Sequence, residues 1–491
     1  MSTSTENPLF ESFTTGCSYI DGAFPPAAHA AKVLDKSTDR TIGMIGMCGN
    51  AELETAAAAA TRAQRQWAGM TFDSRQEVLL AVLGRIQAHR AEIEELIIAE
   101  TGSLRGKAEY EVSAAMGEIM AAIGLAGQPR GELLASQDPN RLSISERIPV
   151  GTVAAITPWN FPLVLAMRVI APAIALGNAV ILKPSPETPL SGGLLLAKLF
   201  EGTRAPHGLF QVLCGDQAFS EALVAHSHVD MVHFTGSSAV GREIARKTGE
   251  SLRRVSLELG GNNALIVLDD ADIEQAATLG AWSAFHYQGQ TCISAGRHIV
   301  SSRVVDSYVK ALVAKASRLR VGDPREPNTD IGPIVNTRQL SRALGLLNDS
   351  VSAGAVIETG GDHNGRFMRP TVLTHVTREM PIWTEEIFAP IAPVVTFDTD
   401  EEAIQIANES QYGLVDSVVT GSEKRGLAVA DKLKAGMVHL NDATPIDEPA
   451  APFGGVGASG LGAPSGGQPN LEAFTERKWV TVQRETPHYP F

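Results

Sequence analysis

Short apolar runs typical of buried β-strands alternate with helical segments from residue 153 onward. The strand-like runs lie at residues 153–156, 179–182, 209–213 and 231–234, and helical segments such as 192–199 and 220–225 separate them. Parallel strands need a long crossover connection, which is usually a helix, so this alternation predicts βαβ units around a parallel sheet. The chain is therefore predicted to have an α/β fold.

The same alternation starts again after Glu258, so we expect a second α/β unit. Its strand-like runs lie at 264–268, 298–301, 418–420 and 437–440, with helices reaching about residue 284 and covering 304–318. A length of 491 residues also predicts two or three domains.

The two ends of the chain carry different patterns. Residues 51–69 are rich in alanine and residues 74–100 have apolar side chains at helical spacing, which predicts long amphipathic helices, the second capped by Asp73 or Ser74. Residues 475–483 are β-like and have no partner strand nearby in sequence, so we expect them to pair with a distant hairpin or another subunit.

Charge and composition exclude several classes of partner. The net charge is −14 and no basic run interleaved with aromatic residues occurs, so nucleic acid is not expected to bind. The longest apolar stretch, residues 163–182, contains Arg168 and Pro172, which disfavour a membrane span. The chain start has no targeting pattern, so we expect a cytoplasmic protein. Four cysteines make neither a disulfide framework nor a zinc spacing, and no metal is predicted.

One cysteine and one glutamate have neighbours that favour catalysis. Cys292 follows the run Gly289-Gln290-Thr291, and Glu258 stands in the run Leu-Glu-Leu-Gly-Gly at 257–261. A thiol attacks an electrophilic carbon only as the thiolate, so a catalytic cysteine needs a nearby proton acceptor. A glutamate among apolar neighbours has its pKa raised by burial and can act as a general base. The structural alternatives are a small buried cysteine and a structural carboxylate.

Three further features lie where predicted strands end. The turn at 236–241 follows a strand and opens a helix, a geometry that binds phosphate, although it is neither a G-x-G-x-x-G motif nor a P-loop. Lys183 follows another strand and can donate to ribose hydroxyls or phosphate. Two prolines at 158 and 162 fix the backbone around Asn160, as an oxyanion donor requires. Each feature also has a structural alternative. The turn at 236–241 fits a plain connector, Lys183 fits a solvated lysine, and the segment around Asn160 fits a rigid turn.

Two competing readings concern histidine and aspartate. His286 and His298 lie near Cys292 in sequence, which leaves a Cys/His hydrolase open, but such pairs usually meet only in the fold. Asp272 with Gln275 resembles a capping box, which we favour over a metal site involving Asp269 and Asp270.

Taken together, these motifs resemble the aldehyde dehydrogenase superfamily over nearly the whole chain. The matching segments are Pro-Trp-Asn-Phe-Pro at 158–162, Lys-Pro-Ser at 183–185, Phe-Thr-Gly-Ser at 234–237 with Gly241, Glu-Leu-Gly-Gly at 258–261, Gly-Gln-x-Cys at 289–292, Glu-Glu-Ile-Phe-Ala-Pro at 385–390 and Pro-Phe-Gly-Gly at 452–455. The resemblance implies a Rossmann-like NAD(P)-binding domain at 1–127 and 149–257 and an α/β catalytic domain at 258–460. It also implies a small β oligomerisation element at 128–148 and 470–491, with a homodimer or homotetramer.

The same resemblance implies roles for individual residues. Cys292 would add to the aldehyde, Asn160 and the Cys292 N–H would hold the oxyanion, and Glu258 would activate the water that hydrolyses the thioester. Lys183 would bind the adenosine ribose and Ser237 the pyrophosphate of NAD. The full cofactor-binding set is expected to be Thr157, Trp159, Lys183, Ser185, Gly215, Phe234, Gly236, Ser237, Gly241, Leu259, Glu386 and Phe388.

The C-terminal part is similar to bacterial benzaldehyde-type dehydrogenases. Asp447-Glu448-Pro449 ahead of the Pro-Phe-Gly-Gly segment, the closing His-Tyr-Pro-Phe at 488–491 and Arg-Val-Ile-Ala-Pro at 168–172 carry this likeness. An aromatic aldehyde is the expected substrate. Its apolar tunnel is expected to use Phe161, Leu165, Ile293, Ile446 and Phe453.

Three departures from the superfamily pattern modify these expectations. Pro186 replaces an acidic residue common in NAD-preferring relatives, so NAD is favoured and NADP tolerated. Pro464 stands in a segment where many relatives have Arg-Glu, so Glu258 is expected to handle water without a second carboxylate. Ala389 replaces a usual glycine and could stiffen the nicotinamide loop.

Three alternatives remain open beside this interpretation. A dehydrogenase of aliphatic aldehydes or semialdehydes would use the same residues. A CoA-acylating relative would also use Cys292, although such enzymes generally lack the glutamate base. A non-catalytic structural protein of the crystallin kind would keep the fold without the activity.

Overall fold

Two parallel β-sheets form the centre of the molecule, whose computed structural model describes residues 16–491. The first sheet has the order β19-β9-β8-β5-β6-β7. Its strands are β5 (Thr152–Ile156), β6 (Ala179–Lys183), β7 (Phe210–Val212), β8 (Met231–Gly236), β9 (Arg254–Leu259) and β19 (Gly460–Leu461). Strands β5 to β9 pair in parallel, and β19 adds to the edge in antiparallel fashion. The predicted βαβ arrangement is confirmed.

The second sheet has the order β12-β15-β16-β11-β10-β17-β18. Its strands are β10 (Asn263–Val267), β11 (Ala295–Ser301), β12 (Val356–Thr359), β15 (Thr371–Thr374), β16 (Ile391–Phe397), β17 (Val415–Val419) and β18 (Met437–Leu440). All neighbours except β12 and β15 pair in parallel. The change from the first sheet to the second falls between β9 and β10, close to the predicted restart after Glu258.

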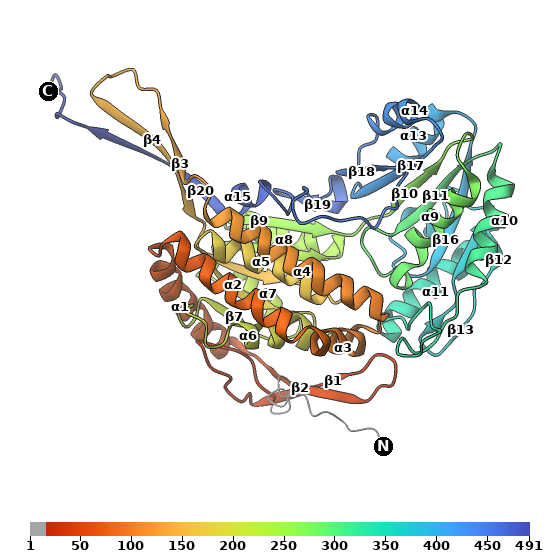
Figure 1. The fold of residues 1–491 in the computed structure, drawn as a ribbon, viewed down its shortest axis with the longest axis horizontal. Helices are drawn as coiled ribbons and strands as arrows, with labels where there is room; N and C mark the ends of the chain where they lie inside the picture. The colour runs from red at the N-terminus through yellow and green to blue at the C-terminus, as the bar shows by residue number, and fades with distance from the viewer. Residues whose placement is uncertain (1–15) are drawn as a thin grey trace.

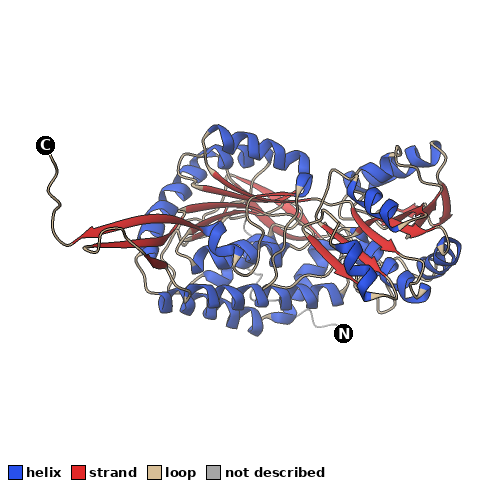
Figure 2. Cartoon of the chain, turned by 90° about the horizontal axis from the view of Figure 1, so that it is seen from above, coloured by secondary structure: helices blue, strands red, loops and turns tan. Residues whose placement is uncertain are grey.

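Helices cover both sheets, as Figure 2 shows. Those of the first part are α1 (Asn50–Ala68), α2 (Phe72–Ala88), α3 (Arg90–Thr101), α4 (Arg105–Ala126), α5 (Pro162–Ala175), α6 (Leu195–Phe200), α7 (Gln217–Ala225) and α8 (Ser238–Glu250). Those of the second part are α9 (Ile273–Phe285), α10 (Val305–Ala316), α11 (Thr337–Ser352), α12 (Pro381–Thr384), α13 (Asp400–Asn408) and α14 (Glu423–Ala430), followed by α15 (Pro469–Phe474). Two hairpins, β1 (His29–Leu34) with β2 (Thr41–Met47) and β13 (His363–Asn364) with β14 (Phe367–Met368), complete the periphery.

The helical prediction for residues 74–100 is wrong in two details. The segment forms two helices, α2 and α3, which meet at His89, where the backbone leaves helical geometry (φ −109°, ψ 20°). The cap of α2 is Thr71, whose Oγ1 accepts a hydrogen bond from Ser74 N at 3.3 Å, so neither Asp73 nor Ser74 is the cap. Thr71 has an extended backbone just before the first turn of α2, so its hydroxyl lies where the free N–H of Ser74 points. Asp272, in contrast, caps α9 as predicted, because its Oδ1 accepts from Gln275 N.

The C-terminal strand pairs with a hairpin distant in sequence. Strand β20 (Thr475–Gln483) runs antiparallel to β4 (Arg141–Pro149), which also pairs with β3 (Gly131–Leu134). Figure 1 shows this three-stranded arm projecting from the rest of the molecule. Of the two partners expected for residues 475–483, the distant hairpin is therefore the one found within the chain.

Candidate active site

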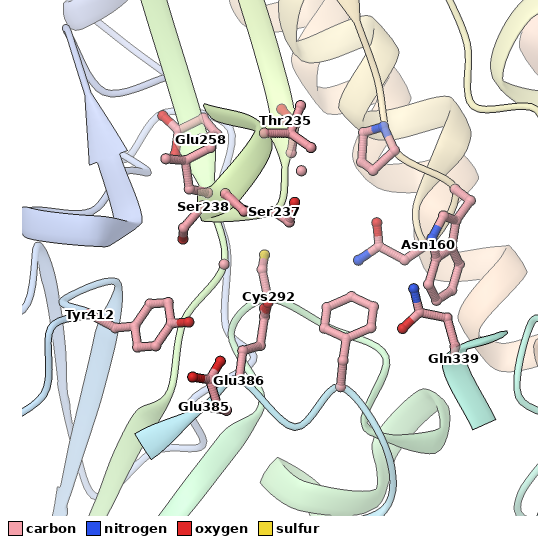
Figure 3. A pocket seen from close by; sticks show the side chains of 18 of the residues that line it. Asn160, Thr235, Ser237, Ser238, Glu258, Cys292, Gln339, Glu385, Glu386 and Tyr412 are labelled. Atoms are coloured by element: carbon pink, nitrogen blue, oxygen red, sulfur yellow. The ribbon is translucent and has the colours of Figure 1, made fainter. Parts of the chain in front are cut away.

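The predicted catalytic residues meet in a cavity lined by residues from both parts of the chain. Asn160 follows β5, Glu258 lies on β9, and Cys292 follows the short helix at His286–Gly289. All three line one cavity of about 610 Å³. Figure 3 shows the Cys292 thiol in the middle of this cavity, with the Asn160 amide on one side and Glu386 and Tyr412 on the other. Residues separated by more than a hundred positions therefore share one site.

The loop before Cys292 is strained and tightly held. Tyr287, Gln288 and Gly289 have consecutive positive φ values of 48°, 56° and 66°. For non-glycine residues this conformation costs on the order of 1–3 kcal/mol each, so the surroundings must enforce it. The Gln288 side chain donates to Gly102 O at 3.0 Å, and the Gln290 side chain accepts from Val335 N at 2.9 Å. These contacts fix the backbone that carries the thiol.

Gly260 and Gly261 permit a close approach of the cysteine loop and of Glu386. A Cβ at Gly261 would lie 2.8 Å from Cys292 O, and one at Gly260 would lie 2.3 Å from the Glu386 carboxylate. Side chains at these positions would displace the cysteine loop and Glu386. The two glycines thus bring β9, Cys292 and Glu386 together.

The surroundings of Cys292 favour the protonated thiol over the thiolate. Burial raises its pKa to about 12, and the carboxylates of Glu386 and Glu258 add to the increase, while Arg168 opposes it. Since the thiolate is the nucleophile, a proton acceptor or a cation must act before the thiol can attack.

Glu258 is a buried carboxyl group with a spare acceptor. Burial raises its pKa to about 8, against the opposing charge of Arg168 and a contact with Ser465. Ser465 Oγ donates to Oε1 at 3.5 Å, and Oε2 is buried with no hydrogen-bond partner in the described residues. A carboxylate with this pKa and a free oxygen fits a general base near neutral pH.

Asn160 has a donor available for an oxyanion. Its Nδ2 donates one hydrogen to Gln290 O at 3.1 Å, which leaves the second hydrogen of the amide. Its Oδ1 is buried without a partner in the described part of the chain. Asn160 and Cys292 both line the main cavity and a second, narrow pocket, and the bond to Gln290 O fixes the amide in this shared lining.

A narrow, largely apolar pocket meets the main cavity at Cys292. Asn160, Leu165 and Cys292 line both spaces. Four of the predicted substrate residues, Phe161, Leu165, Ile293 and Phe453, line the narrow pocket. Ile446 instead lines an outer cavity of about 640 Å³, which shares Tyr110, His286 and Pro445 with the narrow pocket. The two spaces therefore adjoin, and Ile446 does not line the one beside the thiol.

The main cavity has the features of a dinucleotide site. Six predicted cofactor residues line it: Trp159, Gly236, Ser237, Leu259, Glu386 and Phe388. Helix α8 begins there, and its N-cap Ser237 makes no side-chain capping bond, so free backbone N–H groups face the cavity. Trp159 and Phe388 form an edge-to-face pair with centroids 5.4 Å apart.

The other six predicted cofactor residues are buried and do not line this cavity. They are Thr157, Lys183, Ser185, Gly215, Phe234 and Gly241. Gly241 has a packing role, because a Cβ there would lie 2.5 Å from the Leu259 side chain. Their contact with a cofactor stays a prediction.

Several lining residues escaped the sequence reasoning. They are Thr235, Ser238, Ala239, Val240, Arg242, Arg338, Gln339, Arg342, Glu385, Gln411 and Tyr412, together with Ser465 as the partner of Glu258. Ser238, Ala239 and Val240 lie inside the predicted phosphate turn, and Arg242 follows it directly, but none of the four was named as a cofactor residue. Arg338, Gln339 and Tyr412 come from the second part of the chain and carry no local signal.

The two histidines near Cys292 lie in different places. His298 is buried and its Nδ1 lies 2.7 Å from the Tyr308 hydroxyl, outside the lining of the cavity and of the narrow pocket. His286 lines the narrow pocket and stacks on Trp282, with centroids 4.3 Å apart. Burial and the nearby Lys107 charge lower its pKa to about 4, so it is a neutral ring in the pocket wall.

Comparison with known proteins agrees with this geometry. The model of the aldehyde dehydrogenase family matches residues 25–480. The chain is 44% identical to a vanillin dehydrogenase of Amycolatopsis sp. and 42% identical to a benzaldehyde dehydrogenase [NAD(+)] of Pseudomonas putida, each over 94% of this chain and 95% of the relative. A crystal structure of betaine aldehyde dehydrogenase from Staphylococcus aureus in complex with NAD+ superposes with a TM-score of 0.94 at 30% identity, covering 98% of this chain and 97% of that one.

The chain belongs to the aldehyde dehydrogenase family. It is an oxidoreductase that acts on aldehydes. Among residues 16–491, no helix has the length and apolar character that a membrane crossing needs.

Proposed function

We propose that this enzyme oxidises aromatic aldehydes to carboxylic acids with NAD as the hydride acceptor. The observation that carries the proposal is the position of Cys292, which lines both the main cavity and the narrow pocket. A thiol at this junction has the cofactor space on one side and an apolar space for a ring on the other. The relatives named for vanillin and benzaldehyde support the choice of an aromatic substrate.

In the first half of the reaction, the Cys292 thiol gives up its proton to water in the cavity, and the thiolate sulfur adds to the aldehyde carbon. The second hydrogen of the Asn160 amide and the Cys292 N–H hold the oxyanion that forms. Bound NAD supplies the acceptor for the hydride that leaves this carbon. Cys292 then carries the acyl group as a thioester.

In the second half, Glu258 takes a proton from a water molecule that attacks the thioester. The carbon–sulfur bond breaks, the acid is released and the Cys292 sulfur is restored. The free Oε2 of Glu258 is the acceptor suited to this proton. A water acceptor rather than CoA follows from the presence of this base.

The residues of the main cavity fit a dinucleotide. Ser237 and the N–H groups that begin α8 would hold the pyrophosphate, and Glu386 with Phe388 would hold the nicotinamide ribose and ring. Lys183 would reach the adenosine ribose from the end of β6. The carboxylate beside Pro186, Glu187, is already engaged by Lys36 and Asn336 at 2.6 and 2.8 Å. This arrangement supports use of NAD with NADP tolerated.

We also propose the domain roles that the two sheets support. Residues 1–127 and 149–257 would bind the cofactor, residues 258–460 would carry Cys292, and residues 128–148 and 470–491 would join subunits into a dimer or tetramer. The arm of β3, β4 and β20 exposes Leu133 and Trp479 at 75% and 69%, as an association surface would. A cytoplasmic location agrees with four cysteines among which the described residues show no disulfide.

The test is NADH and NADPH formation by the purified enzyme over a panel of aldehydes. Benzaldehyde and substituted benzaldehydes should exceed short alkanals in kcat/KM, and NADH should form faster than NADPH. Higher kcat/KM for alkanals would refute the aromatic assignment. Product formed as a CoA thioester would refute water as the acyl acceptor.

A further inference from the structure

A buried ionic cluster borders the narrow, largely apolar pocket. Arg168 on α5 donates through Nε to Glu118 Oε1 of α4 at 2.8 Å and through its other end to Asp447 Oδ2. Its guanidinium carbon lies 4.5 Å from the centroid of the Phe453 ring. We call Glu118, Arg168 and Asp447 the ionic triad.

Only two members of the ionic triad face the substrate. Arg168 and Asp447 line the narrow pocket together with Cys292 and Asn160, whereas Glu118 does not. The side chain of Glu118 is 2% exposed and that of Asp447 is 17% exposed. The cluster therefore has a closed end at α4 and an open end at the pocket.

An ion pair that only joins two helices would not need a carboxylate that faces the pocket, as Asp447 does. The Arg168–Glu118 pair is by itself sufficient to tie α4 to α5 and to pair both charges. Asp447 uses Oδ2 for Arg168, and an ionised carboxylate has about four acceptor positions, so Oδ1 can accept from a ligand. A few placed polar groups in an apolar pocket are the usual source of ligand orientation and specificity.

The charge of the triad also favours one kind of ligand over another. One guanidinium and two carboxylates leave a formal charge of −1 in a buried setting. A neutral hydroxyl can donate to Asp447, whereas a second carboxylate would meet a like charge in a region where water screens poorly.

We propose that Asp447, held by Arg168, accepts a hydrogen bond from a hydroxyl group on the aromatic ring of the substrate, and that the ionic triad disfavours aldehydes that carry a carboxylate. This assignment rests on the proposed aromatic aldehyde dehydrogenase activity and names the residues that select among ring substituents. Arg168 acts as a positioning residue, since it orients Asp447.

The wild-type enzyme provides the first test. We compare kcat/KM for 2-, 3- and 4-hydroxybenzaldehyde with that for the methylbenzaldehyde of the same position, at a pH where the phenol is not ionised. A hydrogen bond to a charged acceptor predicts a ratio of about ten- to a hundredfold at one ring position. The corresponding carboxybenzaldehyde should be the poorest substrate of the three.

Variants then assign the effect to Asp447. Asp447→Asn should lower the hydroxy-to-methyl ratio about tenfold and raise the carboxy-to-methyl ratio, two changes in opposite directions that a general loss of activity cannot produce. Glu118→Gln is the matched control, because it removes a charge from the same triad outside the pocket. Asp447→Ser carries the same expectation if the Asp447→Asn protein does not fold.

The outcomes separate this inference from the proposed function. Turnover of benzaldehydes with ratios near one at all three positions would overturn the role of Asp447 and leave the proposed function standing. Equal changes in Asp447→Asn and Glu118→Gln would assign the triad to structure alone and also overturn the proposal. Absence of turnover with every benzaldehyde, beside turnover of alkanals, would reject the proposed function itself.

Discussion

Replacing Glu258 with glutamine isolates the second half of the reaction. The substitution keeps the size of the side chain and the contact with Ser465 but removes the proton acceptor. Because Cys292, Asn160 and the cofactor cavity are unchanged, the thiol should still form the thioester and reduce one equivalent of NAD per active site. Hydrolysis should then slow by about 10²–10⁴-fold, the range that a positioned general base contributes.

The pKa of Glu258 predicts how steeply the turnover rate of the wild-type enzyme depends on pH. With a pKa of about 8, Glu258 is about one-tenth ionised at pH 7 and about nine-tenths ionised at pH 9. Steady-state turnover should therefore rise close to tenfold per pH unit below pH 7 and level off above pH 8 to 9. The Glu258→Gln enzyme should lack this rise.

Stopped-flow NADH absorbance with benzaldehyde measures both quantities. A burst of about one NADH per site followed by slow turnover is the expected trace. Steady-state turnover at the wild-type rate, or no burst at all, would remove Glu258 from the hydrolytic role. Thermal unfolding against pH is the control for folding. Burial raises the pKa of Glu258 in the folded state above the ordinary pKa of a glutamate. The contribution of Glu258 to the free energy of unfolding should therefore decrease as the pH rises from that ordinary pKa to about 8, and the glutamine variant should lack this decrease.

Three other substitutions test the remaining parts of the site. Cys292→Ala should abolish aldehyde-dependent NADH formation while NAD still binds, as fluorescence titration would show; residual turnover would exclude the covalent route. Glu386→Gln should lower the pKa of Cys292, because the Glu386 carboxylate contributes to its increase, so alkylation by iodoacetamide at fixed pH should be faster; an unchanged rate would show that burial alone sets that pKa. Asn160→Ala should reduce the burst rate about 10²–10³-fold with little effect on alkylation of Cys292; equal losses in both would mean that Asn160 only supports the loop.

The sequence predicted the parts of the fold that are encoded locally. The strands β5 to β8, β10 and β11 follow from apolar runs. Glu258, Cys292 and Asn160 stand out through their glycine and proline neighbours. The break between α2 and α3 at His89 left no signal, because the apolar spacing continues across it. For β20, the sequence left two partners open, a distant hairpin or another subunit, because β4 lies more than three hundred residues earlier.

The residues that no motif revealed are those that reach the site from a distance. Ser465 touches Glu258 because the chain returns as β19 along the edge of β9. In the sequence, Arg168 is a single charge within an apolar segment. Its partners Glu118 and Asp447 are identified only in the folded structure. Such contacts depend on how the two sheets pack, which local periodicity does not specify.

The charges around Cys292 predict that its reactivity depends on cofactor binding. Glu386 and Glu258 raise the pKa of the thiol, and the Arg168 charge that opposes them is shared with Asp447 and Glu118. The site without ligands therefore favours the thiol, which resists oxidation and alkylation better than a thiolate. Glu386 and Phe388, which would hold the nicotinamide, line the same cavity as Cys292, so the positive charge that a bound nicotinamide supplies would stabilise the thiolate. Iodoacetamide inactivation with and without NAD, measured from pH 6 to 10, should show a lower apparent pKa with NAD. An identical pKa in both profiles would mean that the carboxylates around Cys292 do not link the thiol to the cofactor.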